Sequence, residues 1–261
     1  MTYQPKSATV LQTTGYRWAE FPPHPALARW VSSYWTIETG PGRHVVRTVP
    51  DACVDLTVRL GRTPRAFVAG THARAKRWRI RGRMHLLGAR LLPGTAEQLG
   101  VDVGALTVGW RPLDDFLPRA AVARMVAGAV RATGVGSRVA VLDAFLSERL
   151  LNREIDPRLS AAIRHVFAAG GHVAVSVLAT KSGAHTRTLV RLFEKSVGLS
   201  PKRFARVVRL QAALRALPDR DNWARLAADL GYADQSHFIH DVRELLGASP
   251  GELASLASHT R

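Results

Sequence analysis

Asp51, Cys53 and Asp55 are the residues of this chain whose types and spacing come closest to covalent chemistry. They alternate along the sequence, so a strand would place all three side chains on one face. A thiolate at Cys53 could accept an alkyl group, but two neighbouring carboxylates raise the pKa of a thiol and disfavour the thiolate. Because Cys53 is the only cysteine, neither an internal disulfide nor a multi-thiolate zinc site can form. We predict that the protein is not an enzyme.

Three histidines of the N-terminal half, His44, His72 and His85, raise the question of a metal site. A cupin-type site needs a closely spaced His-x-His pair followed by a glutamate, and the sequence has no such pair. We therefore predict that the protein binds no metal and needs no cofactor.

Four arginines, Arg77, Arg79, Arg81 and Arg83, recur at every second position. In a strand their side chains point to one side, with Trp78 on the other. A solvated face explains this pattern, because charge on an edge strand blocks pairing with another strand. The alternative is that these arginines form an anion-binding or effector face.

The N-terminal half has the sequence pattern of a β-rich domain. Short β-branched or alternating runs, separated by glycine and proline, extend from about residue 42 to residue 92. The expected strands cover residues 44–49, 54–60, 67–70, 77–83 and 85–91. This pattern predicts a compact sheet or small barrel.

Helices are expected on both sides of this strand-rich stretch. Before it, apolar residues spaced three and four apart predict a short helix over residues 26–35. After it, alanine-rich and leucine-rich runs predict helices over residues 120–132 and 139–151. These two helices either pack on their own sheet or join it to the next domain and form a dimer seam. A polar stretch ending in Asp-Pro at residues 156–157 is typical of a domain boundary.

The whole-chain composition favours a polyanionic partner. The chain has 261 residues, which suits two domains, and 37 Lys and Arg against 20 Asp and Glu give a formal net charge of +17. An excess of this size is typical of a nucleic-acid-binding protein. No run of about 18 apolar residues and no signal-peptide pattern appears, so we expect a cytoplasmic protein that does not enter a membrane.

The C-terminal part contains a helix-turn-helix pattern. Phe238, Val242 and Leu245 fall on one face of a helix that begins after Asp234, a residue type suited to the N-cap. Gly231 can supply the left-handed residue that turns the chain between this helix and the preceding one. One face of the second helix packs, and the other is free to contact a partner.

A second copy of the same pattern lies upstream. Its helix is preceded by Gly183, as the other is by Gly231. The segment Gly198-Leu199-Ser200-Pro201 mirrors Gly247-Ala248-Ser249-Pro250. A continuous apolar stripe predicts one long helix over residues 201–217 that spaces the two copies.

Residues 231–250 resemble the second helix-turn-helix of AraC-type transcription regulators, whose pattern runs G-[FY]-x-[DS]-[QP]-S-x-F, then a basic residue, then G-x-[ST]-P. The matching residues are Gly231, Tyr232, Asp234, Gln235, Ser236, Phe238, Gly247, Ser249 and Pro250. The chain departs from the family at Val242, usually Phe, at His240, usually Arg, and at His185, usually a Ser cap. A weaker resemblance to one sensor type of the family covers residues 49–56 and 88–94.

The resemblance implies an α+β fold. An N-terminal β-rich domain, cupin-like or a small barrel with flanking helices, would be followed by an all-α domain with two helix-turn-helix motifs joined by a long helix. The expected bounds are 1–133 for the sensor or effector domain, 134–156 for a linker or dimerisation helix, and 157–261 for the DNA-binding domain.

An α-helix fits the major groove of B-DNA, where each base pair presents its own pattern of donors and acceptors. By resemblance, base contacts fall on Arg187, Val190, Arg191, Gln235, Ser236, His237 and His240. Lys202, Arg206 and Arg243 are better suited to phosphates, which fix the register without reading sequence. Two helices one spacer apart would read two successive grooves.

The resemblance also implies the partners. These are double-stranded DNA and RNA polymerase, with a small-molecule effector and a second copy of the chain as further candidates. The arginine face would then meet an acidic effector, a DNA phosphate or an acidic surface of RNA polymerase. Two alternatives stay open: a DNA-alkylation-response regulator with Cys53 as alkyl acceptor, and an architectural protein that binds DNA without sequence preference.

Overall fold

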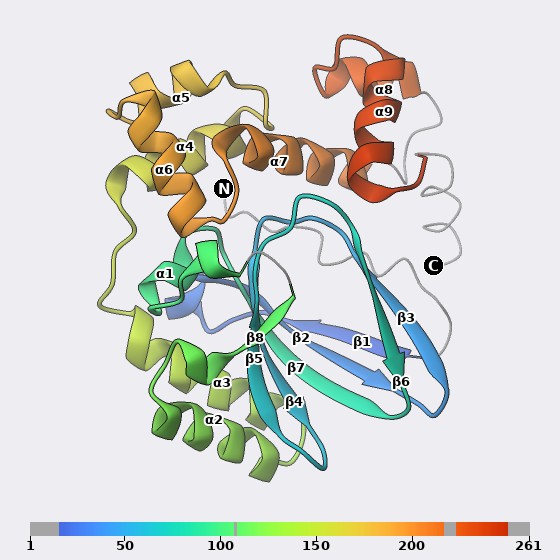
Figure 1. The fold of residues 1–261 in the computed structure, drawn as a ribbon, viewed down its shortest axis with the longest axis vertical. Coiled ribbons are helices and arrows are strands. Elements are labelled where there is room, and N and C mark those ends of the chain that lie inside the picture. Colours follow the sequence, from blue (N-terminus) through green and yellow to red (C-terminus); the bar gives the residue numbers. More distant parts are fainter. Residues whose placement is uncertain (1–15, 107–108, 217–222, 250–261) are drawn as a thin grey trace.

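A β-rich N-terminal half is followed by a helical C-terminal half in the computed structural model, which describes residues 16–106, 109–216 and 223–249 (Figure 1). The predicted α+β fold is confirmed. The strands are β1 Tyr16–Phe21, β2 Val31–Thr39, β3 Arg43–Thr48, β4 Val54–Leu60, β5 Arg65–Ala69, β6 Lys76–Arg81, β7 Met84–Leu91 and β8 Trp110–Pro112. The helices are α1 Thr95–Gln98, α2 Arg119–Arg131, α3 Val135–Leu150, α4 Pro157–Ala168, α5 Val175–Lys181, α6 Thr186–Ser196, α7 Pro201–Ala216, α8 Trp223–Asp229 and α9 Gln235–Leu246. Short 3₁₀ turns cover Pro25–Leu27, Val103–Ala105 and Leu113–Asp115.

The strands form a six-stranded antiparallel sheet in the order β1-β2-β7-β4-β5-β8 and a separate antiparallel ribbon of β3 and β6. Strand β7 lies inside the sheet between β2 and β4, and its Leu87, Ala89 and Leu91 are fully buried. The five strands expected from the sequence are all present. Strands β1 and β8 were not expected, because they lie outside the stretch of about residues 42–92 that has the strand pattern.

The helix predicted over residues 26–35 is wrong. Pro25–Leu27 form a single 3₁₀ turn, and the chain then enters β2 at Val31. The four apolar residues that suggested a helix are nevertheless buried in the core, namely Leu27, Trp30, Val31 and Tyr34. Pairing of β2 with both β1 and β7 therefore outweighs the local periodicity.

Helices α2 and α3 cover one face of the six-stranded sheet. Met125 from α2 and Leu142 and Leu146 from α3 belong to the same buried cluster as Leu56 and Leu87 of the sheet. Of the two arrangements expected for these helices, the structure has the one in which they pack on their own sheet.

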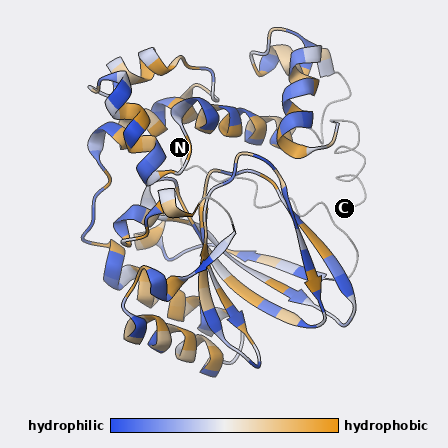
Figure 2. Ribbon diagram, viewed as in Figure 1, coloured by the Kyte–Doolittle hydropathy of each residue, from blue (hydrophilic) through white to orange (hydrophobic). Residues whose placement is uncertain are grey.

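The helical half is built around α7. Figure 1 shows α7 running from the pair α5–α6 at one end to the pair α8–α9 at the other. Figure 2 shows hydrophobic and hydrophilic residues alternating along α7. Its Phe204 and Val208 belong to the core of the first pair, and its Leu210 and Leu214 belong to the core of the second. Leu217 and Pro250, which the sequence motifs included, lie outside the described residues.

Within the part of the chain that the structure describes, none of the helices has the length and apolar character needed to cross a lipid bilayer.

Candidate nucleic-acid interface and ligand cavity

Helix α9 begins and ends where the sequence pattern predicts. The Asp234 carboxylate accepts a hydrogen bond from the backbone N–H of His237 at 2.7 Å, which caps the helix start. The helix ends at Gly247, whose φ of +64° is left-handed. Gly231, with φ +67°, turns the chain from α8 into α9, and a Cβ there would lie 2.8 Å from Nδ1 of His172. Glycine is therefore required at this turn.

Helix α6 has the same glycine turn and buried face as α9, but it lacks a side-chain hydrogen bond at its N-cap. Gly183 takes a φ of +67°, matching the value at Gly231. Leu189 and Phe193 are fully buried and face the core of the first helix-turn-helix. His185 at the N-cap makes no side-chain capping hydrogen bond, in contrast to Asp234 of the second unit.

The predicted base-reading side chains lie on the outer faces of the two helices. Six of the seven are exposed, and Val190 is half-buried. The exposed residues are Arg187 and Arg191 on α6, and Gln235, Ser236, His237 and His240 on α9. Both helices therefore present hydrogen-bonding groups to solvent.

Two of the three predicted phosphate contacts, Lys202 and Arg243, are exposed cations. Arg206 is different, because its guanidinium is held within the chain. Its Nε donates to the buried Asp241 carboxylate at 2.9 Å, and a second nitrogen donates to Glu244 at 2.6 Å. We therefore assign Arg206 to the joint between α7 and α9 and not to DNA phosphate.

Asp241 and Glu244, the partners of Arg206, were not predicted from the sequence. Asp241 also accepts a hydrogen bond from the Tyr232 hydroxyl at 2.9 Å, so three polar groups fix α9 against α7 and the turn before it. Hydrogen bonds from Arg206 and Arg74 lower the pKa of Glu244 to about 2. One feature of the sequence could have revealed this joint. Asp241 lies next to Val242, on the face of an amphipathic helix that is otherwise apolar.

The arginine face lies on the outside of the β3–β6 ribbon. Arg77, Arg79, Arg81 and Arg83 are all exposed, as the alternation predicts. Across the ribbon, Arg47 pairs in register with Arg77, so the same face carries further positive charge. The opposite face of β6 lines a cavity, and none of the four arginines contributes to that cavity.

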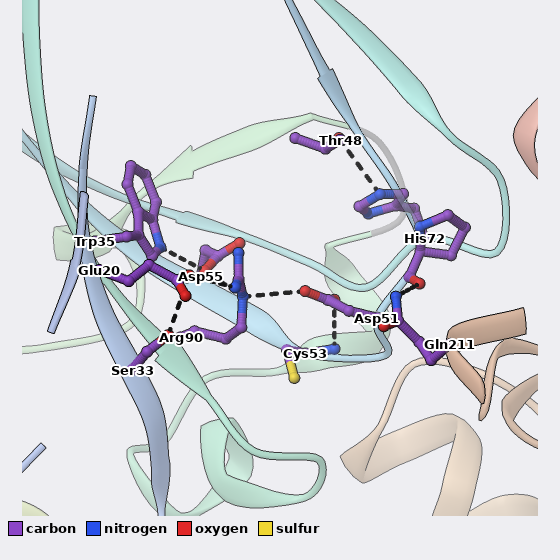
Figure 3. Close-up of polar contacts among 11 residues, drawn as sticks. Glu20, Ser33, Trp35, Thr48, Asp51, Cys53, Asp55, His72, Arg90 and Gln211 are labelled. Atoms are coloured by element: carbon purple, nitrogen blue, oxygen red, sulfur yellow. Dashed lines mark hydrogen bonds and ion pairs between the residues drawn. The ribbon is translucent and has the colours of Figure 1, made fainter. Parts of the chain in front are cut away.

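A cluster of buried charges lies beneath that cavity. Arg90 on β7 has a side chain only 3% exposed, and three carboxylates surround it. Figure 3 shows the arrangement, with nitrogen–oxygen distances of 3.1 Å to Glu20, 3.0 Å to Asp51 and 3.7 Å to Asp55. Burial raises the pKa of both Asp51 and Asp55, and the positive charge of Arg90 opposes that rise. Asp51 and Asp55 stood out in the sequence, but their pairing with Glu20 and Arg90 did not, because these two residues lie in distant strands.

The cavity itself lies between the six-stranded sheet and the ribbon, and amounts to about 70 Å³. We call it the tryptophan box, after the four residues Trp18, Trp35, Trp78 and Trp110 that line it. The Trp18 and Trp35 rings stack with centroids 5.3 Å apart. Trp78 and Trp110 meet edge to face at 5.6 Å. This cavity was not predicted from the sequence.

Cys53 lies at the edge of the same region and is buried. Burial, followed by the charge of Asp51, raises the pKa of its thiol well above the ordinary value. The carboxylates thus raise the thiol pKa as expected, but burial raises it more. A thiol in this state is a poor alkyl acceptor.

The three histidines of the N-terminal half have separate surroundings. His44 lies 3.0 Å from the carbonyl of Gly40, His72 contacts Thr48, and His85 faces Glu38. Among the residues that the structure describes, no group of three or more His, Cys, Asp or Glu side chains is arranged to hold a metal ion.

One loop of the N-terminal half contacts the C-terminal ends of both α6 and α9. We call residues 70–75, between β5 and β6, the coupling loop. The Thr71 hydroxyl donates to the carbonyl of Val197, directly after α6, at 2.7 Å. The Ala75 N–H donates to the carbonyl of Leu245, in the last turn of α9, at 2.7 Å. The same loop lines the tryptophan box with Gly70 and with His72, whose pKa burial lowers to about 4.

Two further contacts join the halves of the chain. Glu97 of α1 lies 2.6 Å from the Lys195 ammonium and also accepts a hydrogen bond from Ser196, so α1 is tied to α6. The Gln211 amide on α7 donates to the carbonyl of Pro50 at 2.7 Å, next to Asp51 of the buried charge cluster (Figure 3). The N-terminal half is therefore joined to α6, α7 and α9 of the helical half.

The paired helices, their glycine turns and the exposed polar faces of α6 and α9 define a helix-turn-helix protein of the DNA-binding class. Residues 178–255 match the family described as "Helix-turn-helix domain". The C-terminal part of the chain is an AraC-type helix-turn-helix domain, which is a DNA-binding domain. The resemblance predicted from the two sequence motifs is thereby confirmed for this part.

The β-rich half matches a different family. Residues 19–107 match the "Domain of unknown function (DUF6597)". No curated protein matches the chain.

Several solved structures are similar to parts or most of the chain. A transcriptional regulator with an AraC-type DNA-binding domain from Chromobacterium violaceum is 21% identical, with 40% of this chain and 96% of that chain covered and a TM-score of 0.38. A probable AraC family transcriptional regulator from Rhodopseudomonas palustris is 26% identical, covering 39% and 98%, with a TM-score of 0.35. ToxT from Vibrio cholerae is 7% identical, covering 93% and 99%, with a TM-score of 0.45.

Proposed function

We propose that the chain regulates transcription by placing α6 and α9 in two successive major grooves of a specific DNA site. The observation that carries this proposal is the exposure of the predicted base-reading residues on both helices, which lie at opposite ends of α7 (Figure 1). Arginine can pair bidentately with guanine O6 and N7, and glutamine with adenine N6 and N7. Because α6 and α9 present unlike side chains, a specific site is favoured over the architectural alternative.

Phosphate contacts are proposed for Lys202 and Arg243 only. Both are exposed, whereas Arg206 is held by Asp241 and Glu244. The formal net charge of +17 supports a general attraction to DNA, which adds affinity at low salt without adding specificity.

Selection of bound duplexes from a random pool, followed by footprinting of the full chain on the selected sequence, tests this proposal. We expect two protected major-groove segments about 10 base pairs apart, and an affinity at least about 1,000-fold above that for random DNA. A single protected segment would contradict reading by both helices. Equal affinity for the selected site and for random DNA would support an architectural protein instead.

We also infer that a ligand in the tryptophan box modulates DNA binding through the coupling loop. The loop supports this because His72 lines the box while Thr71 and Ala75 bond the ends of α6 and α9. On this view the sensor domain extends past the predicted end at residue 133 and includes α3, which packs on its sheet, and the DNA-binding domain begins at residue 157. RNA polymerase and a second copy of the chain stay predicted partners.

Replacing Thr71 with valine tests the coupling loop, since valine keeps the shape of threonine and removes the donor to Val197. We expect a loss of about 1 kcal/mol in the free energy of unfolding, because the carbonyl loses its hydrogen bond. We also expect about fivefold weaker binding to the selected DNA, because α6 is less fixed before binding and must be ordered on the DNA. Urea denaturation and fluorescence anisotropy measure the two effects.

Thr180→Val is the matched control, because Thr180 is exposed on α5 and bonds only a carbonyl of its own helix, that of Ser176. It should leave DNA affinity within about twofold, since surface substitutions of this kind change free energies by about 0.5 kcal/mol or less. Unchanged or tighter DNA binding by Thr71→Val would show that the coupling loop does not support the binding arrangement.

A further inference from the structure

The arginine face is a strongly positive surface. Arg77, Arg79 and Arg81 of β6 are exposed, and so is Arg43 of β3, which points to the same side of the ribbon. With the residues that the structure describes, these four side chains make no ion pair or hydrogen bond. The sequence around β6 adds no carboxylate, since residues 56–96 contain nine arginines and one lysine but no aspartate or glutamate. An anion from outside the chain would therefore meet charge that no described residue neutralises.

The strand register sets arginine against arginine. Arg43 lies opposite Arg81, and Arg47 lies opposite Arg77. Opposed side chains of an antiparallel pair have Cβ atoms about 4.5–5.5 Å apart, so like charges there destabilise the ribbon. Charge that only keeps an edge strand from pairing needs no such repulsion, because a lysine opposite a glutamate blocks pairing and also stabilises the ribbon. The register therefore favours anion binding over a solvated face.

The inner face of the ribbon holds these arginines in a fixed row. Ile80 and Val46 point away from the arginines and belong to the same buried cluster as Ile37 and Leu86 of the six-stranded sheet. Alternate residues of a strand lie about 6.7 Å apart, so the three arginines of β6 form a row about 13 Å long. A fixed row of cations fits an extended anion with repeated charges better than it fits a small ligand.

The ribbon lies directly beside the end of α9. The Ala75 N–H, just before β6, donates to the carbonyl of Leu245, and Arg74 pairs with Glu244 at 2.8 Å. Val49, just after β3, is buried in the same core as Leu245. Figure 1 shows β3 and β6 below the end of α9. The arginine face therefore belongs to the same end of the molecule as the second helix-turn-helix.

We propose that the arginine face binds the phosphate backbone of duplex DNA outside the two segments read by α6 and α9. Each DNA strand carries a phosphate about every 3.4 Å of helix axis, so successive arginines can meet separate phosphates. The planar guanidinium of arginine binds phosphate bidentately. Such contacts carry no sequence information and add affinity that falls with salt. This inference rests on the proposed function, since the two reading helices bring the duplex to the ribbon.

The salt dependence of DNA affinity tests this inference. Arg77→Gln, Arg79→Gln and Arg81→Gln are combined in the full chain. The duplex carries the selected site and extends about 10 base pairs, one helical turn, beyond each protected segment. Affinity is titrated between about 50 and 200 mM salt, and each lost phosphate contact lowers the slope of log affinity against log salt by about 0.9. We expect the slope to fall by about 2–3, with base preference unchanged.

Helix α2 offers the matched control. Arg119→Gln, Arg124→Gln and Arg131→Gln remove the same charge from exposed positions of α2, which covers the opposite face of the six-stranded sheet. This variant should leave the slope almost unchanged, because its arginines face away from the ribbon. Equal slopes for the ribbon variant and the α2 variant overturn the proposal.

Two further measurements separate charge and position from folding. Arg77→Lys, Arg79→Lys and Arg81→Lys together keep the charge and should keep most of the slope. On a duplex trimmed to the two protected segments, the glutamine variant and the unchanged chain should have the same slope, and an equal fall there would overturn contacts outside the segments. Urea unfolding should show the same or a higher midpoint for the glutamine variant, because it removes like-charge repulsion.

An acidic protein is the competing partner for the arginine face. Binding of polyglutamate that the glutamine variant loses, together with an unchanged slope on DNA, overturns the DNA contact. Preference for the selected site with an unchanged slope refutes the ribbon contact and keeps the regulator. A slope that falls on selected and random DNA alike, without preference for either, refutes the regulator and keeps the ribbon contact.

Discussion

Replacing Arg90 with methionine is expected to lower the free energy of unfolding by about 3–5 kcal/mol at pH 7. Methionine has a similar length, so the loss comes mainly from charge. Glu20, Asp51 and Asp55 would remain at the base of the β-rich half without the guanidinium that now compensates them. Equilibrium unfolding in urea measures the loss, with tryptophan fluorescence as the signal.

The loss should depend on pH with a definite sign. Without Arg90, the pKa values of Asp51 and Asp55, already raised by burial, rise further. A carboxyl whose pKa is higher in the folded state than in the unfolded state destabilises the fold above that range, and protonation in acid relieves this. The difference between Arg90→Met and the unchanged chain should therefore shrink from pH 8 to pH 5.

Arg17→Met is the matched control for this experiment. Arg17 also pairs with a glutamate, Glu38, but its side chain is 86% exposed. Exposed ion pairs contribute about 0–1 kcal/mol, so this variant should unfold almost as the unchanged chain does. A loss below about 1 kcal/mol for Arg90→Met would show that the carboxyls around it are already neutral.

The second large effect is expected for a double substitution in α6 and α9, the two helices proposed to read DNA. Arg187→Ala and Gln235→Ala should each lose about 1–3 kcal/mol of binding free energy for the selected DNA site. Because the two residues lie on different helices at opposite ends of α7, the losses should add, giving about 2–6 kcal/mol for the double variant. Each single variant should relax preference at base pairs in only one of the two protected segments.

Anisotropy titrations at one fixed salt concentration, on the selected site and on variants mismatched in either segment, measure these losses. Arg164→Ala is the control, because Arg164 is an exposed cation of α4 that bonds Ser160 and lies outside both reading helices. It removes the same charge as Arg187→Ala and should leave base preference intact. Equal loss on all sequences would assign Arg187 to phosphate, and no loss would remove it from the interface.

The helical half could be predicted closely because its signals are local. An N-cap aspartate at Asp234, a glycine at Gly231 and a stripe through Phe238 and Val242 each act within a few residues. The two copies also support one another, and the structure gives Gly183 and Gly231 the same φ of +67°. The ion pairs of Arg206 could not be predicted in this way, because its partners Asp241 and Glu244 lie about 35–38 residues away in the sequence.

The β-rich half was predicted less well because its arrangement depends on distant pairing. The apolar spacing of Trp30 and Tyr34 fits a helix as well as a buried strand, and only the pairing of β2 with β1 and β7 decides between them. The tryptophan box assembles side chains as far apart as Trp18 and Trp110. No short motif encodes such a site, although the alternation that separates Trp78 from the arginines on β6 already marked one of its walls.

The shared attachment of α6 and α9 to the coupling loop bears on how steeply the protein can respond to a signal. A shift of this loop would disturb both of the proposed DNA contacts simultaneously. Free energies add, so affinities multiply, and two losses of about fivefold would combine to about 25-fold. A displacement too small to matter at either groove alone would then suffice to release the chain from its site.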